Sequence, residues 1–278
     1  MEISNQRLHL LDALRGLTVL SMIAYHALWS MVNLYGYDLP FFGGTGSYIW
    51  QQSICCTFIL LSGFSLNLSR RPIRRGLTVF LAGALVSAAT LLFVPQAAII
   101  FGVPTLIGSS MLIFSLLFRR GMAAGSADSA SAQSGISEVR AGTAKSIGGL
   151  AGGTAACLLC LAAFLLTKSV PDGFIGNDFV SIAELPSALY RDYFTAFIGF
   201  PPADFFTADY FPLIPWLFLF GCGFFSFKGI TSCLGGFLRR GSSLKALTFI
   251  GRHSLIIYLL HQPAIVLVLE LIKLLRKA

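Results

Sequence analysis

Long apolar runs constrain the fold of this chain more than any other feature. A helix needs about 20 apolar residues to cross a hydrocarbon core about 30 Å thick. Of the 278 residues, 55% are hydrophobic and only 12% are charged. Together with a mean hydropathy of +0.77, this composition excludes an ordinary water-soluble domain. The candidate spans are seven runs at about residues 9–32, 48–68, 76–94, 98–118, 147–167, 212–227 and 247–272.

The runs predict helices and not the strands of a barrel. Strands of a membrane barrel alternate polar and apolar residues over about ten positions, whereas these runs are apolar on all sides. The first run has no small-x-small cleavage site and carries charged residues, so we expect a permanent span and not a signal peptide. The sequence therefore predicts an all-α integral membrane protein, a bundle of about seven transmembrane helices forming one domain over residues 1–278.

The distribution of Lys and Arg predicts the orientation of the bundle. Cytoplasmic loops carry the excess of these residues. The connections 69–75, 119–146 and 228–245 are rich in them, whereas 33–47 has none and 169–211 has one Arg against six acidic residues. We therefore expect a multi-pass protein of the plasma membrane with a cytoplasmic N-terminus. The net charge of +8 reflects this bias, so we expect membrane lipid and no nucleic acid as a partner. The basic tail, Lys273, Arg276 and Lys277, goes against this placement.

Two connections differ in composition. Residues 121–146 are rich in Ser, Ala and Gly and lack aromatic residues, which is typical of a flexible linker, here on the cytoplasmic side. Residues 169–211 contain aromatic residues and prolines, so we expect this extracytoplasmic loop to pack over the outer mouth of the bundle. This loop either covers a site and helps to recognise a substrate, or forms an interfacial aromatic belt.

The cysteines predict neither a disulfide framework nor a metal site. Five of the six lie within apolar spans. Cys157 and Cys160 have the spacing of a redox pair, but their apolar surroundings favour two small packing residues. No cluster of Asp, Glu and His suggests a metal ligand set, so we expect no metal.

The first span carries charge where lipid is expected. A charged side chain at membrane depth costs at least about 2.5–3.5 kcal/mol, so it is normally paired or functional. Asp12 and Arg15 are three residues apart and share one helix face. His26 lies eleven residues after Arg15, which is about three turns and a rise of about 16 Å. These three residues are predicted to form one polar stripe facing the bundle interior.

The last span repeats this arrangement. Arg252 lies near its predicted cytoplasmic end, and His261 lies nine residues later, about 13–14 Å deeper. The two arginines are then at one depth, and His26 and His261 lie together nearer the outer face. A lone snorkelling arginine or a lone structural histidine does not explain both pairs.

The stripe suggests transfer of an acyl group. Arginines near the cytoplasmic side suit an anionic donor that carries phosphate. A neutral imidazole shielded from water suits a general base toward an acceptor hydroxyl or amine, or a nucleophile that carries the acyl group.

Five segments in order resemble one known family. They are "LDALRGLTVLSMIAYH", "FILLSGFSLNLSRR", "IIFGVPTLIGSSML", "DYFPLIPWLFLFGCGFF" and "IGRHSLIIYLLHQP". The chain resembles the catalytic domain of the heparan-alpha-glucosaminide N-acetyltransferases and, more distantly, the membrane acyltransferases of bacterial surface polysaccharides. The long luminal N-terminal region of the animal enzymes is absent, so we expect a bacterial relative at the cell envelope and not an enzyme for lysosomal heparan sulfate.

The resemblance implies residue roles. It implies transfer from cytoplasmic acetyl-CoA to an amino sugar or glycan at the extracytoplasmic face. The implied catalytic residues are His26, first, and His261, and the implied donor-binding residues are Arg15, Arg252 and His253. Candidate substrate-binding residues are Asp12, Trp216, which could stack on a sugar or anchor the span, and Thr105, which stands where the family often has a histidine.

Two other interpretations stay open. Intramembrane Arg, His and Asp also build the pathways of transporters and exporters, although the two halves of this chain do not repeat. A noncatalytic scaffold for envelope synthesis is the third interpretation. The choice between N- and O-acylation, the acyl length and the choice between direct transfer and an acetyl-histidine intermediate stay open as well.

Overall fold

The computed structural model describes residues 8–118, 139–177, 180–239 and 244–276, with only the backbone for 139–150 and 237–239. Helices make up most of this structure, which confirms the predicted all-α class. The chain forms two compact units. One combines residues 1–61 with 233–278, and the other contains residues 62–232.

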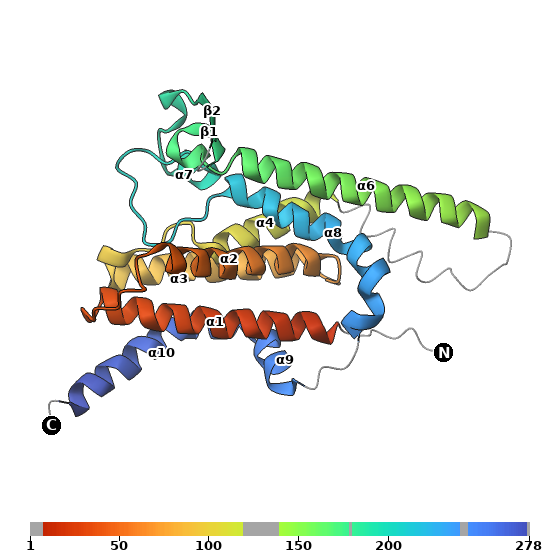
Figure 1. Cartoon of the computed structure of the whole chain (residues 1–278). Helices are drawn as coiled ribbons and strands as arrows, with labels where there is room; N and C mark the ends of the chain where they lie inside the picture. The colour runs from red at the N-terminus through yellow and green to blue at the C-terminus, as the bar shows by residue number, and fades with distance from the viewer. Residues whose placement is uncertain (1–7, 119–138, 178–179, 240–243, 277–278) are drawn as a thin grey trace. The chain divides into compact units, whose positions relative to one another are not determined.

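The first unit is built on α1 (His9–Asn33), α9 (Lys245–Arg252) and α10 (Ser254–Leu275), together with α2 (Thr45–Leu66) as far as Leu61. α9 lies across the part of α1 where that helix begins (Figure 1). Two glycines allow this approach: a Cβ on Gly16 would lie 2.0 Å from the Leu247 carbonyl oxygen, and one on Gly251 would lie 1.9 Å from the Asp12 carbonyl oxygen. The backbones of α1 and α9 therefore touch directly.

The last apolar run differs from its prediction as one helix. It is divided at His253, which separates α9 from α10. The His253 backbone leaves helical geometry at φ −100° and ψ 16°, while its N–H is shared between the carbonyls of Phe249 and Ile250. Because α9 ends there, it can cross α1 while α10 runs along it. The sequence analysis treated residues 247–272 as one apolar run and did not reveal this break.

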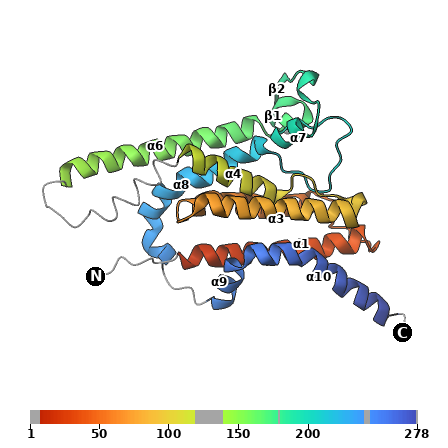
Figure 2. The same ribbon diagram turned by 180° about the vertical axis from the view of Figure 1, so that it is seen from behind.

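The second unit contains α3 (Pro72–Phe93), η1 (Pro95–Ala97), α4 (Val103–Leu117), α6 (Val139–Leu166) and α8 (Leu213–Arg239) up to Ser232. α3 and α4 lie side by side (Figure 2). Gly83 and Gly108 permit this contact, because a Cβ on either would come within 2.5 Å of the partner helix.

Helices α6 and α8 also lie side by side. Cys157 and Cys222 face each other between them, each sulfur within 3.6 Å of the other residue's carbonyl oxygen. All six cysteines are free thiols. Of the predicted linker 121–146, residues 121–138 lie outside the described residues, and α6 already includes the remainder.

The predicted loop 169–211 contains short elements of its own. They are η2 (Val170–Asp172), β1 (Phe174–Asn177), β2 (Val180–Glu184), η3 (Ser187–Leu189) and α7 (Tyr193–Ile198). β1 and β2 pair antiparallel, with an irregularity between Ile175 and Gly176. The Asp192 side chain caps α7 by accepting from the Thr195 backbone N–H at 2.8 Å.

Four of the described helices are long and apolar enough to cross a membrane: Thr45–Leu66, Pro72–Phe93, Leu213–Gly236 and Ser254–Leu275. Val103–Leu117 and Ala151–Leu166 are shorter apolar helices. α1 has the length, at 25 residues, but carries the charged stripe. The count of about seven spans, the single domain and the orientation stay predictions.

Candidate functional site

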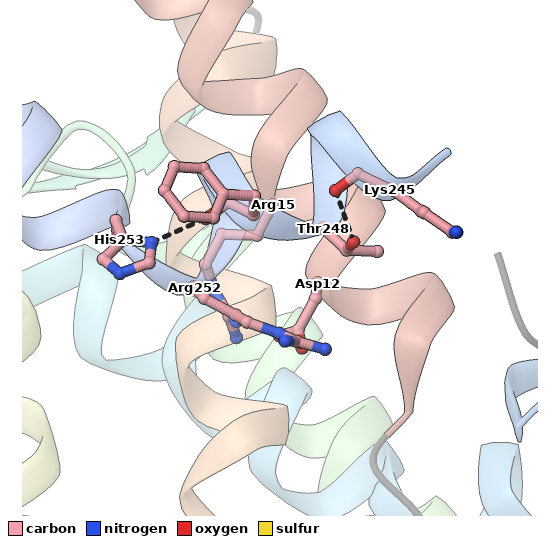
Figure 3. Close-up of polar contacts among 7 residues, drawn as sticks. Asp12, Arg15, Lys245, Thr248, Arg252 and His253 are labelled. Carbon is pink, nitrogen blue, oxygen red and sulfur yellow. Dashed lines mark hydrogen bonds and ion pairs between the residues drawn. The ribbon is translucent and has the colours of Figure 1, made fainter. Parts of the chain in front are cut away.

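An arginine–carboxylate cluster lies where α9 crosses α1 (Figure 3). Arg15 Nη1 is 3.0 Å from Asp12 Oδ1, and Arg252 Nε is 3.6 Å from Asp12 Oδ2. The Arg15 and Asp12 side chains are only 13% and 19% exposed, whereas that of Arg252 is 39% exposed. One carboxylate thus contacts two guanidinium groups, one from its own helix and one from α9.

The sequence builds this cluster in two steps. A separation of three residues places Asp12 and Arg15 on one face of α1. Gly251 then brings the backbone of α9 against Asp12, so that the next residue, Arg252, reaches the second carboxylate oxygen. A larger residue at position 251 would move Arg252 away.

An imidazole pair lies farther along α1 and α10. The ring centroids of His26 and His261 are 4.8 Å apart, with an angle of 61° between the planes. This proximity confirms the expectation that the two histidines lie together. Their positions in the chain place them about 16 Å along α1 from Arg15.

One hydrogen bond fixes the tautomer of His261. Its Nδ1 contacts the carbonyl oxygen of Tyr258, which can only accept, so Nδ1 carries the proton and Nε2 of the neutral ring has a free lone pair. His261 Nε2 and His26 Nδ1 are both buried and have no hydrogen-bond partner among the described residues. Buried polar atoms are nearly always satisfied, so two such atoms on adjacent rings point to a ligand.

Beyond the imidazoles, further side-chain hydrogen bonds join the α1 segment to α10. Ser30 Oγ is 3.5 Å from Gln262 Oε1, and the Tyr35 hydroxyl donates to Glu270 Oε1 at 3.0 Å. Ser30, Tyr258 and Gln262 were not identified from the sequence. Helical spacing could have found two of them, because Ser30 lies four residues from His26 and Tyr258 lies three from His261. Gln262 directly follows His261 and has no such spacing.

Comparison with known proteins decides the family. The sequence matches the family model described as "Heparan-alpha-glucosaminide N-acetyltransferase, catalytic" over residues 7–132 and 152–263, which is most of the chain. The chain belongs to this family. No match was found among curated proteins or solved structures. Both clusters lie inside the matched residues, and the unmatched interval 133–151 overlaps the predicted linker.

Family and apolar helices together identify a membrane acetyltransferase. The predicted resemblance is thereby confirmed, while the bacterial origin and the wider relation to polysaccharide acyltransferases stay predictions. Among the residues that the structure describes, no three His, Cys, Asp or Glu side chains form a group that could hold a metal ion.

The structure gives His253 a different environment from its neighbour Arg252. His253 is exposed, and its Nδ1 is 2.9 Å from the Phe249 carbonyl oxygen. Its ring packs on the Phe249 ring at 4.4 Å between centroids. Figure 3 shows the His253 ring apart from the Asp12 carboxylate. His253 therefore ends α9 and stays accessible from the surface of the acetyltransferase.

Trp216 and Thr105 belong to the other unit and have the environment of packing residues. Trp216 is 8% exposed, with the Phe164 ring at 5.4 Å and the Phe211 ring at 4.9 Å. Thr105 is 6% exposed and packs against Gly83 of α3. The ligand-binding roles of both residues stay predictions.

Asp209 is an acidic group that sequence reasoning missed. Its Oδ2 would lie 3.3 Å from a Cβ on Gly102, and the Val103 backbone N–H donates to the carboxylate at the start of α4. Burial raises the pKa of Asp209 to about 7, against the opposing effect of that hydrogen bond. Asp209 thus stabilises the first turn of α4 from a segment about 100 residues later. Its place directly before "YFPLIPW" was the only signal in the sequence.

Proposed function

We propose that this acetyltransferase moves an acetyl group from acetyl-CoA, bound from the cytoplasmic side, to an amino sugar or glycan at the extracytoplasmic face. The observation that carries the proposal is the pairing of two clusters on one helix. The arginines of the Asp12 cluster lie at one level of α1, and the imidazole pair lies about 16 Å farther along it. A donor whose phosphates and thioester are joined by a long flexible arm suits such a separation.

The donor binds through Arg15 and Arg252. Guanidinium groups form short, paired hydrogen bonds with phosphate oxygens. Asp12 holds both side chains in place, and the Arg252 side chain, 39% exposed, is accessible to an anion. His253, exposed one residue after Arg252, gives a further contact at the rim.

Transfer takes place at the imidazole pair. His261 Nε2 accepts the proton of the acceptor N–H or O–H while that atom attacks the thioester carbonyl carbon. The carbon–sulfur bond breaks as the new carbon–nitrogen or carbon–oxygen bond forms, and the thiolate leaves with the proton returned from the imidazolium. His26 orients the thioester for direct transfer or carries the acetyl group itself between donor and acceptor. The bare Nε2 of His261 supports the base role.

The orientation follows from the arginine-rich connections. They support a cytoplasmic position for the start of α1, and with it for the Asp12 cluster. The imidazole pair then lies toward the outer leaflet. The family's name supports an α-linked glucosaminide as the first acceptor to test, with an amine as the acetylated group.

The test uses purified protein in lipid nanodiscs with acetyl-CoA labelled in the acetyl group. Methyl α-D-glucosaminide, N-acetylglucosamine oligosaccharides and an unrelated hexose form the acceptor panel. We expect label in the glucosaminide that depends on both imidazoles, and loss of transfer in His261→Ala and His26→Ala. Absence of transfer to any amino sugar or glycan would contradict the proposal. Vesicle uptake of a sugar that persists in His26→Ala would instead favour a transporter.

A further inference from the structure

A series of aromatic rings leads from the imidazole pair to the protein surface. The His26 ring contacts the Tyr25 ring at 5.8 Å between centroids, Tyr25 contacts Trp50 at 5.4 Å, and Trp50 contacts Phe41 at 6.4 Å. Phe42 contacts Tyr25 at 5.2 Å. Exposure rises along the series from 8% at Tyr25 to 56% at Phe41. All of these residues belong to α1, α2 and the connection between them.

The rings are held in fixed orientations. The Trp50 indole N–H donates to Ser21 Oγ at 2.8 Å, which sets the plane of that ring at 83° to Tyr25. Phe41 lies against the first turn of α2, where a Cβ on Gly46 would come 2.7 Å from its ring. A rigid aromatic surface binds at low cost, because little side-chain freedom is lost when a ligand stacks on it.

We infer that Trp50, with Phe41 and Phe42, forms the stacking surface for the sugar ring of the acceptor. This inference rests on the proposed function and assigns the acceptor a place within it. A pyranose has one face of C–H groups, which packs on aromatic rings, and an edge of hydroxyl or amino groups, which needs polar partners. The series supplies the first, and the half-buried Gln262, the residue after His261, supplies the second. Aromatic walls with a few polar groups are typical of small-molecule sites.

The location of these rings favours a substrate role over an anchor in the membrane interface. An acceptor atom must come within hydrogen-bond distance of an imidazole nitrogen, so its sugar ring must lie beside His26. The Tyr25 ring contacts the His26 ring, and the Trp50 ring contacts the Tyr25 ring. A residue that only anchors the protein in the membrane interface needs no link to the imidazoles. Trp216 offers no comparable surface, because it is buried, whereas Trp50 is half-buried.

The test uses the three tryptophans of the chain, Trp29, Trp50 and Trp216. In a Trp29→Phe, Trp216→Phe protein, Trp50 is the only fluorophore of its kind. We expect methyl α-D-glucosaminide to change the Trp50 emission in a saturable manner. An emission that is unchanged while the sugar binds in equilibrium dialysis would overturn the inference, as would failure of the sugar to bind at all.

Steady-state kinetics give a second readout. We expect Trp50→Ala to raise the KM for the glucosaminide about tenfold, with the Kd for CoA unchanged, because an aromatic contact contributes about 0.5–1.5 kcal/mol beyond its buried area. Tyr48, an exposed aromatic residue on the same helix turn, is the matched control, since Tyr48→Ala removes an interfacial ring without touching the series. Equal effects of the two substitutions would contradict a substrate role and indicate an interfacial anchor.

Failure of the inference is distinguishable from failure of the proposed function. Acetyl transfer to the glucosaminide with an unchanged KM in Trp50→Ala refutes the stacking surface alone. Saturable quenching of Trp50 by the sugar without any acetyl transfer refutes the enzyme and leaves a sugar-binding site.

Discussion

Asp12 Oδ2 lies 3.6 Å from Arg252 Nε, although the two residues are 240 positions apart and belong to different helices. The same carboxylate contacts Arg15 of its own helix at 3.0 Å. This shared carboxylate joins the beginning and the end of the chain, and it gives the proposed donor end of the site its shape.

The two arginines should contribute differently to stability. Arg15 is 13% exposed and Arg252 is 39% exposed, so the first pair is better shielded from water. In double-mutant cycles with Asp12→Asn, we expect a coupling free energy above about 1 kcal/mol with Arg15→Gln and below about 1 kcal/mol with Arg252→Gln. Thermal unfolding in detergent gives these values. Equal couplings would mean that burial does not determine the strength of these pairs.

Arg252→Gln should therefore reveal the donor role most cleanly. Because its ion pair contributes little to stability, we expect a folded protein with CoA affinity weakened about tenfold, measured by titration calorimetry. Lys245→Gln is the control, since this exposed residue also belongs to α9 but contacts neither Asp12 nor Arg15 in Figure 3. A similar loss of affinity in both variants would indicate general attraction by positive charge.

Close backbone contact between α1 and α9 should make Gly251 intolerant of any side chain. A Cβ there would lie 1.9 Å from the Asp12 carbonyl oxygen, so the helices must separate in Gly251→Ala. Overpacking of this kind costs about 1–3 kcal/mol, and the midpoint of unfolding should fall accordingly. Gly152→Ala is the control, because nothing lies within 4 Å of a Cβ at that helical position. A Gly251→Ala protein as stable as Gly152→Ala would exclude the contact.

Asp209 should make the stability of the acetyltransferase depend on pH. Burial raises its pKa to about 7 in the folded protein, whereas an unfolded chain has an ordinary carboxyl pKa of about 3.9. Between these values the folded state binds more protons than the unfolded state, so this group lowers stability as pH rises from about 4 to 7. In Asp209→Asn the Val103 N–H keeps an acceptor and the titration disappears. Unfolding temperatures from pH 5 to 8 should fall less in the variant, and parallel profiles would contradict this.

The sequence was sufficient to predict the pairs and insufficient to predict the packing that forms them. Spacing within a helix predicts Asp12 beside Arg15, and the similar Arg-to-His intervals of the first and last spans predict His26 beside His261. The break at His253 could not be predicted, since it depends on α9 packing against Gly16. Apolar composition likewise does not tell the buried Trp216 from the half-buried Trp50, because both are tryptophans in aromatic segments.

The central claim is that the donor binds at the Asp12 cluster, whereas the acetyl group is transferred at the imidazole pair farther along α1. It is tested most directly by measuring the CoA dissociation constant and the transfer rate together in His261→Ala. The account predicts a rate at least about 100-fold lower, as expected for loss of a general base, with a CoA affinity unchanged within about twofold. A variant that binds CoA and transfers acetyl groups at the native rate would contradict it.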